Sequence, residues 1–412
     1  MANNMNKIDK LINEFCPDGV EFMELGEILD YEQPTNYIVK SVKYDDEFKN
    51  PVLTAGQSFI LGYTNEDFGI YDAGENNPVI IFDDFTTSFH RVLFKFKVKS
   101  SAMKILKVKK NKNVIFKYVY YAMRCIKYEP QDHARHWISK YSKFSIPIPP
   151  LPIQEEIVKI LDSFTELEAE LEAELEARKK QYEYYRDELL TFGDLSADKA
   201  SDVEFKELGE IFNFKNGYTP SKSKSKYWAN GTIPWFRMDD IRQNGNILDK
   251  SLQYVNENAI KGKKLFPNNS IIVATSATIG EHALINVPHL CNQRFVSLSI
   301  KNEFQNKLKI KFIYYYFYLL DKWCLNNTTK SSFASVDMVG FRKFPIPLPS
   351  LQEQKRIVKI LDKFDSLVND ISIGLPAELN ARRKQYEYYR EKLLTFKEKK
   401  QIYEYDKDKK NT

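Results

Sequence analysis

Apolar residues in the middle of the chain recur at alternating steps of four and three. The stripe is formed by Ile153, Ile157, Ile160, Phe164, Leu167 and Leu171, and is continued by Tyr182, Tyr185, Leu189 and Phe192. This period places the apolar side chains on one helix face and is typical of helices that pack against each other. The pattern predicts one helix from Ile153 to Phe192, about 60 Å long at ~1.5 Å per residue.

A second copy of this pattern lies near the end of the chain. Ile157–Asp162 recurs unchanged as Ile357–Asp362, and Gln181–Arg186 recurs as Gln385–Arg390. Each copy opens with a proline-rich stretch, IPIPPLPIQEEI or IPLPSLQEQKRI, whose prolines favour an extended lead-in. Neither helix has enough apolar surface to be stable alone, so we expect the two to pack together as antiparallel partners. Chance similarity of two surface helices is the alternative, and the identical hexapeptides argue against it.

The first helix contains the unit ELEA three times, over Glu166–Ala177. Each four-residue unit keeps its leucine near one face and adds roughly 6 Å of helix, about one turn. Gain or loss of a unit would change the separation of the two helix ends and preserve the stripe. A generic charged helix is the alternative interpretation. In the second copy, Gly374 and Pro376 predict a kink or break.

Related decapeptides, GVEFMELGEI and DVEFKELGEI, open two globular segments that each end at a proline-led helix. The predicted domains are an N-terminal helix (1–18), a first globular domain (19–143), a first helical region (144–192), a linker (193–201), a second globular domain (202–343), a second helical region (344–396) and a charged tail (397–412). Strands are predicted at PVIIFDDF, VLFKFKV, NVIFKYVYYAM and CNQRFVSLSI, and SIIVATSATIGEHALI is predicted to be a strand that enters a Thr/Ser/Gly loop. The fold class is α+β: two α/β domains separated by two long helices packed as an antiparallel coiled coil, with a pseudo-two-fold internal repeat.

Composition narrows the class of protein. A length of 412 residues suggests two or three domains, and 43% hydrophobic residues can form sizeable cores. The four cysteines make no CxxC pair, which favours free thiols in a reducing compartment. No apolar run approaches 18 residues, so we expect a soluble, cytoplasmic protein with no membrane association. The net charge of +5 is weak evidence for an anionic partner.

Catalytic motifs are hard to find in this sequence. It has no GxxxxGK[ST] or GxGxxG phosphate loop and no NPPF or DPPY stretch of the kind that amino-methyltransferases use. His133 and His136 have no Cys or carboxylate motif to complete a metal site. Asp83 and Asp84 have no downstream Glu-x-Lys to complete a nuclease centre, and read better as polar groups at a strand end. We predict no catalytic residues and no bound metal or cofactor.

The first globular segment has a basic stretch without counter-charges. From Phe85 to Tyr128 there is no Asp or Glu, while lysines, arginines and aromatics recur throughout. Alternation in Phe94–Lys99 predicts lysines on one face of a strand, which suits phosphate contacts. We therefore predict that this stretch binds nucleic acid. The alternative is a strand and turn whose lysines are exposed to solvent and bind no nucleic acid. The residues predicted to contact nucleic acid are His90, Arg91, Lys95, Lys97, Lys110 and Lys112.

The second globular segment combines lysines with side chains that can read base edges. Arg, Asn, Gln and Asp can bind bases in a major groove, whereas Thr, Ser and Lys can hold phosphates. Taken singly, each of these residues is more often an ordinary polar group of a loop. The residues predicted to contact DNA are Lys222, Lys224, Lys226, Tyr227, Trp235, Arg237, Arg242, Thr275, Ser276, Thr278, Gln293 and Arg294.

These motifs jointly resemble the specificity subunit of type I restriction-modification systems, over nearly the whole chain. The likeness rests on the proline-led helix openings, the QYEYYR and LLTF endings, the LGEI starts and the tandem ELEA units. The second globular domain also resembles a target-recognition domain (target domain) of this family, through GYTPSKSKSKYWANGTIPW, ATSATIG and CNQRF. The first departs from that pattern, with FDDFTTSFHRV where the second has VATSATIGEHALINVPHLCNQRFV.

The resemblance implies a non-catalytic subunit that reads double-stranded DNA. Each target domain would read one half of a split, asymmetric sequence, and the two helices would fix the gap. The helices would also dock two methyltransferase subunits, which bring S-adenosylmethionine; restriction subunits with ATP-driven, magnesium-dependent translocation would join them. Expected docking residues, equally open to a role in the helix core, are Ile157, Ile160, Leu161, Tyr182 and Tyr185. The rival classes are a two-headed scaffold that binds no DNA and a fused nuclease or methyltransferase.

Overall fold

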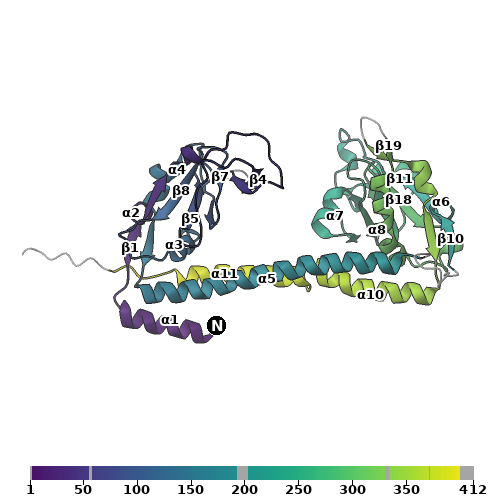
Figure 1. Cartoon of the computed structure of the whole chain (residues 1–412). Coiled ribbons are helices and arrows are strands. Elements are labelled where there is room, and N and C mark those ends of the chain that lie inside the picture. The colour runs from purple at the N-terminus through teal and green to yellow at the C-terminus, as the bar shows by residue number, and fades with distance from the viewer. Residues whose placement is uncertain (1, 55–57, 193–202, 330–333, 371, 400–412) are drawn as a thin grey trace, which may run out of the picture. The chain divides into compact units, whose positions relative to one another are not determined.

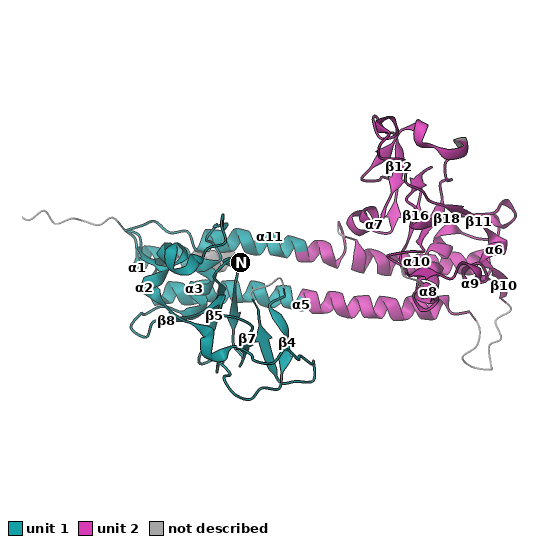
Figure 2. Ribbon diagram, turned by 90° about the horizontal axis from the view of Figure 1, so that it is seen from above, with its two compact units in different colours: residues 1–170, 380–412 teal, residues 171–379 magenta. Residues whose placement is uncertain are grey.

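The computed structural model describes residues 2–54, 58–192, 203–329, 334–370 and 372–399 (Figure 1). Its contacts divide the chain into two compact units, residues 1–170 with 380–412 and residues 171–379 (Figure 2). The predicted linker 193–201 and residues 400–412 of the predicted tail lie outside the described residues.

Unit 1 contains an α/β domain and the first part of the long helix α5. Its elements are α1 (Ala2–Phe15), β1 (Glu21–Glu24), α2 (Leu25–Ile28), β2 (Leu29–Glu32), η1 (Pro34–Tyr37), β3 (Asn50–Leu53), β4 (Ile60–Thr64), β5 (Val79–Asp83), β6 (Phe89–Val92), β7 (Lys97–Val98), β8 (Met103–Val108), α3 (Phe116–Met123), α4 (His136–Ser139), η2 (Tyr141–Lys143), β9 (Ser145–Ile148), and those parts of α5 (Leu151–Leu190) and α11 (Leu375–Leu393) that lie within its boundaries. One sheet has the order β2-β8-β5-β6 and a smaller one β4-β3-β7.

Unit 2 repeats this plan with a larger domain. Its elements are β10 (Glu204–Glu207), α6 (Leu208–Ile211), β11 (Phe212–Asn216), η3 (Ser225–Tyr227), β12 (Ile233–Phe236), α7 (Met238–Asn244), β13 (Ile247–Leu248), β14 (Tyr254–Val255), η4 (Glu257–Ala259), η5 (Lys261–Lys263), β15 (Ser270–Ala274), β16 (His282–Ile285), β17 (Leu290–Cys291), β18 (Phe295–Ile300), η6 (Asn302–Phe304), α8 (Ile310–Asn326), β19 (Thr328–Thr329), β20 (Ser335–Val336), α9 (Met338–Arg342), β21 (Pro345–Leu348) and α10 (Leu351–Asn369). The main sheet has the order β11-β18-β15-β16-β13, beside a three-stranded sheet β14-β12-β17.

The proline-led lead-ins are extended strands, as predicted. Pro147 of β9 lies opposite Phe22 of β1, and Pro347 of β21 lies opposite Phe205 of β10, each in a two-stranded antiparallel sheet. A strand with one neighbour tolerates proline because it needs few N–H donors. Each of these strands leads directly into a helix of the repeat, so the domain and the helix pair are joined at the same point in both units.

The repeated helices pair in antiparallel fashion within each unit. In unit 1 Phe164 of α5 stacks on Tyr389 of α11, and four residues later Glu168 accepts a bond from Arg383 at 2.6 Å. In unit 2 the rings of Tyr182 and Tyr185 stack on Phe364 of α10. The second copy is interrupted between Asn369 and Leu375, which confirms the break expected from Gly374 and Pro376.

One predicted strand is a helix. The run NVIFKYVYYAM was predicted to be extended from its β-branched and aromatic residues, but Phe116–Met123 forms α3. Tyr118, Val119 and Tyr121 are buried on more than one face of this helix, so its sequence shows no clear helical stripe. Tertiary packing on α5 therefore overrides local propensity here.

A polar clasp joins α3 to α5. Asp162 of α5 accepts bonds from Lys117 Nζ and from the Tyr121 hydroxyl, both at 2.6 Å. The same clasp in unit 2 consists of Lys311, Tyr315 and Asp362. Burial and the bond to Asp362 raise the pKa of Tyr315, so this tyrosine stays a proton donor. The internal repeat thus extends from sequence to side-chain bonding.

Gln354 anchors the domain of unit 2 to α10. It is fully buried; its Oε1 accepts from Lys309 N at 2.8 Å, and its Nε2 donates to the carbonyls of Lys307 and Pro349. Gln354→Ala should destabilise the protein by about 2–4 kcal/mol, because backbone groups lose their partners in a buried place. Denaturant unfolding followed by tryptophan fluorescence measures this loss. Exposed Gln352→Ala is the matched control; equal shifts for the two variants would contradict the prediction.

Candidate nucleic-acid interface

Two parallel strands of unit 2 bring predicted base-reading residues together. β12 pairs with β17, with Trp235 opposite Leu290 and Phe236 opposite Cys291. Parallel strands end at the same edge, and there Asn292 N donates to Phe236 O at 3.0 Å. Arg237 follows β12 and the Asn292–Arg294 loop follows β17, so residues far apart in sequence lie side by side.

This edge encloses a hollow of about 230 Å³. Its lining residues are Thr219, Arg237, Met238, Asp239, Asn292, Gln293 and Arg294. Three of the predicted contacts, Arg237, Gln293 and Arg294, are therefore brought together. Gln293 and Arg294 are exposed, and among the described residues no carboxylate pairs with Arg294. The set offers guanidinium and amide groups, which suit the edges of guanine and adenine.

The backbone of Arg237 is fixed by a hydrogen bond to a nearby carboxylate. Its N–H donates to Asp240 Oδ2 at 2.7 Å at the start of α7, and burial raises the pKa of Asp240. The guanidinium lies 5.7 Å from the Trp235 ring and 3.4 Å from Asp239, while its buried Nε has no partner within the described residues. The Arg237 side chain is about one-third exposed. A pre-positioned arginine with a spare donor suits base recognition.

The same domain carries three predicted lysines on an exposed loop. Lys222, Lys224 and Lys226 are exposed and have no ion-pair partner in the described ranges, and the last two lie 5.5 and 5.9 Å from the Tyr227 ring. A DNA contact from Trp235 is not supported, because its ring is buried and its Nε1 donates to Tyr218 O at 2.9 Å. Trp235 supports the fold beneath the loop.

The other predicted contacts of unit 2 do not share the Arg237 hollow. Arg242 is 60% exposed and lies 4.0 Å from Glu281. Thr275 is tied by its N–H to Arg294 O, and Ser276 bridges to Ser335. The Thr278 hydroxyl oxygen is buried, so a phosphate contact from it is not supported.

The basic stretch of unit 1 is largely neutralised by distant carboxylates. Lys97 is buried and lies 3.0 Å from Glu66, and Lys104 is buried 3.2 Å from Asp84. Lys95, Lys107, Lys109, Lys117 and Lys127 also have carboxylate partners from outside the stretch. Burial and this pairing do not support the DNA contact predicted for Lys97. Phe96, Lys97 and Val98 are all buried, because β7 is too short for inside–outside alternation to persist.

Several cations of unit 1 remain available. Lys110 and Lys112 lie in the turn after β8 without ion pairs in the described chain, and the Lys95–Asp72 pair is exposed and therefore weak. His90 and Arg91 lie on β6 beside a hollow of about 480 Å³. Burial and the neighbouring Arg124 lower the pKa of His90, so its ring, stacked on Phe59, is neutral at pH 7. Phe59 and Arg124 belong to this basic, aromatic hollow and were not predicted.

The predicted docking residues are mostly buried within their own unit. Ile157 and Leu161 are fully buried, and Ile160 and Tyr182 are 7% and 4% exposed. These four form the helix core, the alternative that was left open. Tyr185 is 40% exposed and is available for a partner.

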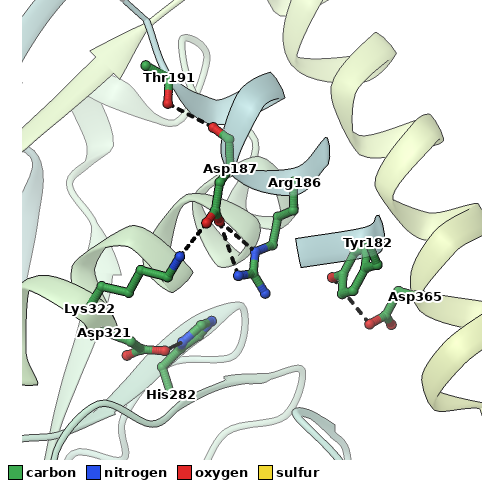
Figure 3. A network of polar contacts seen from close by, with 8 residues as sticks. All are labelled: Tyr182, Arg186, Asp187, Thr191, His282, Asp321, Lys322 and Asp365. Carbon is green, nitrogen blue, oxygen red and sulfur yellow. Dashed lines mark hydrogen bonds and ion pairs between the residues drawn. The ribbon is translucent and has the colours of Figure 1, made fainter. Parts of the chain in front are cut away.

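A polar network connects α5 to the domain of unit 2 (Figure 3). Asp187 binds both Arg186, at 3.1 Å, and Lys322 of α8, while the Arg186 guanidinium stacks 4.2 Å from the Tyr318 ring. Nearby, His282 Nδ1 lies 2.5 Å from Asp321 Oδ2. Salt bridges and stacking from one helix therefore restrain the orientation of the recognition domain in this unit.

The residues considered above for a metal site or a nuclease centre have hydrogen-bond partners within the protein. The Asp84 carboxylate accepts from Trp137 N at 2.8 Å, Asp83 accepts from Phe85 N, and buried His136 lies 3.0 Å from the Tyr128 hydroxyl. Among the residues that the structure describes, no group of three or more His, Cys, Asp or Glu could hold a metal ion. No described helix is long and apolar enough to span a membrane.

A family model, the type I restriction modification DNA specificity domain, matches residues 17–177 and 200–381. The chain belongs to the family of type I restriction-modification specificity subunits, whose role is DNA sequence recognition. The EcoR124I/EcoR124II specificity subunit of Escherichia coli is 45% identical over 413 residues, covering 96% of this chain and 98% of that subunit. The EcoprrI specificity subunit of Escherichia coli is 58% identical over 204 residues, 48% of this chain and 51% of the relative. A solved structure concerned with complex assembly and conformational transition of the type I R-M system matches with a TM-score of 0.60 at 17% identity, covering 91% of this chain and 97% of that one, and supports the fold.

Proposed function

We propose that this chain reads a split, asymmetric DNA sequence, with one half-site bound by each target domain. The observation that carries this proposal is the convergence of Arg237, Gln293 and Arg294 at one edge of the unit 2 domain. The unit 1 domain presents a different surface, with His90, Arg91 and Arg124 around its hollow. Two different surfaces recognise two different half-sites.

The antiparallel helices supply the spacing in this proposal. The ELEA units lie within α5, which runs unbroken from Leu151 to Leu190. The exposed helix faces dock methyltransferase subunits, two in number, and restriction subunits join that assembly. The chain itself is non-catalytic: S-adenosylmethionine, ATP and magnesium belong to the partners. Because a methyltransferase works on a base turned out of the duplex, the reader must accept distorted DNA.

Adenine methylation mapping tests the proposal directly. Cells that make this chain with its modification subunit should methylate a split, asymmetric motif, and the motif should vanish when this chain is deleted. Absence of such a motif, although both subunits are made and co-purify, would refute the proposal and favour a scaffold without DNA binding.

The salt dependence of DNA affinity, measured with the purified chain, distinguishes a DNA reader from a scaffold. Six or more phosphate contacts should lower DNA affinity by about 10³-fold or more between 50 and 200 mM salt. Fluorescence anisotropy with a labelled duplex measures this slope. A chain that shows no measurable DNA binding even at low salt, while still co-purifying with its partner, fits the scaffold. Methylation or cleavage by the purified chain alone would instead reveal a catalytic site.

A further inference from the structure

The hollow beside Arg237 is lined by residues whose hydrogen-bond acceptors are already engaged within the protein. Gln293 Oε1 accepts a hydrogen bond from the Thr219 hydroxyl, and Asn292 Oδ1 accepts from Arg294 N at 3.0 Å. The backbone carbonyls of Arg237, Asn292 and Arg294 also accept from backbone N–H groups. Few acceptors are therefore left for a molecule that binds in this hollow.

The donors of the same hollow are largely unused. Arg237 Nε is buried and has no partner in the described part of the chain. Within the described ranges, the amide nitrogens of Asn292 and Gln293 and the guanidinium of Arg294 also donate to no other group. The lining includes the carboxylate of Asp239, which lies 3.4 Å from the Arg237 guanidinium. The hollow thus offers N–H donors from four side chains to whatever enters it.

This set of donors matches one base. Guanine has two acceptors, O6 and N7, on its major-groove edge, whereas adenine and cytosine each have an amino group that donates. A glutamine that reads adenine accepts from N6 with its oxygen and donates to N7 with its nitrogen. Because Thr219 binds the oxygen of Gln293, this side chain offers its nitrogen. Adenine or cytosine in the hollow would therefore place an amino group against donors.

Phosphate oxygens are acceptors too, but the composition of the hollow favours a base. Two of its four donor side chains, Asn292 and Gln293, are neutral amides, which supply direction without charge. Cationic side chains suited to phosphates lie on the exposed loop of the same domain. These are Lys222, Lys224 and Lys226.

We propose that the unit 2 hollow reads one guanine through its O6 and N7 atoms, and that Thr219 is a positioning residue that sets this choice. The inference rests on the proposed DNA reading by the unit 2 domain and adds which base the hollow selects. Thr219 was not among the predicted contacts. Without its hydroxyl, the Gln293 amide can turn and present its oxygen as well as its nitrogen. The bond from Thr219 therefore separates guanine from adenine at this position.

Substitution of Thr219 in the complex with the modification subunit tests the choice of base. At the position that Arg237→Ala relaxes, the wild-type complex should bind a duplex with A·T in place of G·C about 10- to 100-fold more weakly. Thr219→Val should reduce this ratio to below about three-fold, because the freed amide can pair with adenine. Thr219→Ser keeps the hydroxyl and should retain the wild-type ratio. Thr232→Val, exposed and outside the hollow, is the matched control and should also retain it.

Base analogues at the same position identify the atoms that are read. 7-Deazaguanine lacks the N7 acceptor and should weaken binding by about 10-fold. Hypoxanthine lacks only the minor-groove amino group of guanine, so it should bind as guanine does. Fluorescence anisotropy with labelled duplexes measures both affinities.

Four results would overturn the guanine assignment. The position relaxed by Arg237→Ala could prove not to be a G·C pair, or Thr219→Val could keep the full preference for guanine over adenine. A loss from Thr219→Val that is equal for every duplex would make the hollow a phosphate site, and a loss on hypoxanthine would place the reading in the minor groove. In all four cases a methylated split motif would leave DNA reading itself intact, whereas the absence of any motif would refute both proposals.

Discussion

Deletion of one ELEA unit should shorten the gap between the half-sites by about one or two base pairs and leave both half-sites unchanged. Removing Glu170–Ala173 takes about 6 Å and roughly one turn from α5, compared with 3.4 Å per base pair in DNA. The flanking units are identical to the one removed, so Leu167 and Leu175 continue the same stripe. Insertion of a fourth unit should lengthen the gap by the same amount. Methylation mapping of cells carrying each variant measures the gap.

The control for length replaces Glu170–Ala173 by ALEE, which keeps both the number of residues and the composition. This variant should methylate the original motif with the original gap. If the deletion instead changed bases within a half-site, the helix would be part of the reading surface, and its role as a spacer would be refuted.

Substitution of Arg237 should relax recognition at one base pair. Arg237→Ala should cost ~1–3 kcal/mol on the intact site, because a bidentate contact to a base is lost. For this variant, altering that one base pair should cause no further loss of affinity. It should therefore bind the altered duplexes as well as it binds the intact site. Equilibrium binding to the intact site and a set of single-base variants measures both effects, once methylation mapping has supplied the motif.

Two comparison variants separate base reading from charge. Arg237→Lys keeps the charge without the planar fork, so it should lose specificity almost as fully as the alanine variant. Lys224→Ala removes an exposed lysine and should weaken all duplexes alike, with the salt slope reduced by about one. A uniform loss from Arg237→Ala, equal for every duplex, would place Arg237 among the phosphate contacts instead.

The helical part of the fold could be predicted because its signal is local. The repeat with steps of four and three located α5 within two residues of its observed ends, and glycine and proline located the break before Leu375. The run at Phe116–Met123 could not be assigned in the same way. Its aromatic side chains are buried on several sides of α3, so the local pattern carried no helical period.

The recognition surface was harder to predict because its contacts depend on distant partners. The lysine-rich stretch has no acid of its own, yet Glu66 and Asp84 neutralise Lys97 and Lys104 from other elements. Arg237 and Gln293 were each proposed from residue type. Their proximity depends on the parallel pairing of β12 with β17, which no local pattern indicates.

The discontinuity of unit 1 has a consequence for synthesis of the protein. Unit 2 is one continuous segment, whereas unit 1 needs residues 1–170 together with the segment that begins at residue 380. Val20 even exchanges backbone hydrogen bonds with Lys397 and Lys399. At ~5–20 residues per second, the first segment waits roughly 10–40 s for its partner helix, while unit 2 can already fold. The nascent chain therefore completes unit 2 before unit 1 and exposes the apolar face around Phe164 until the last helix emerges.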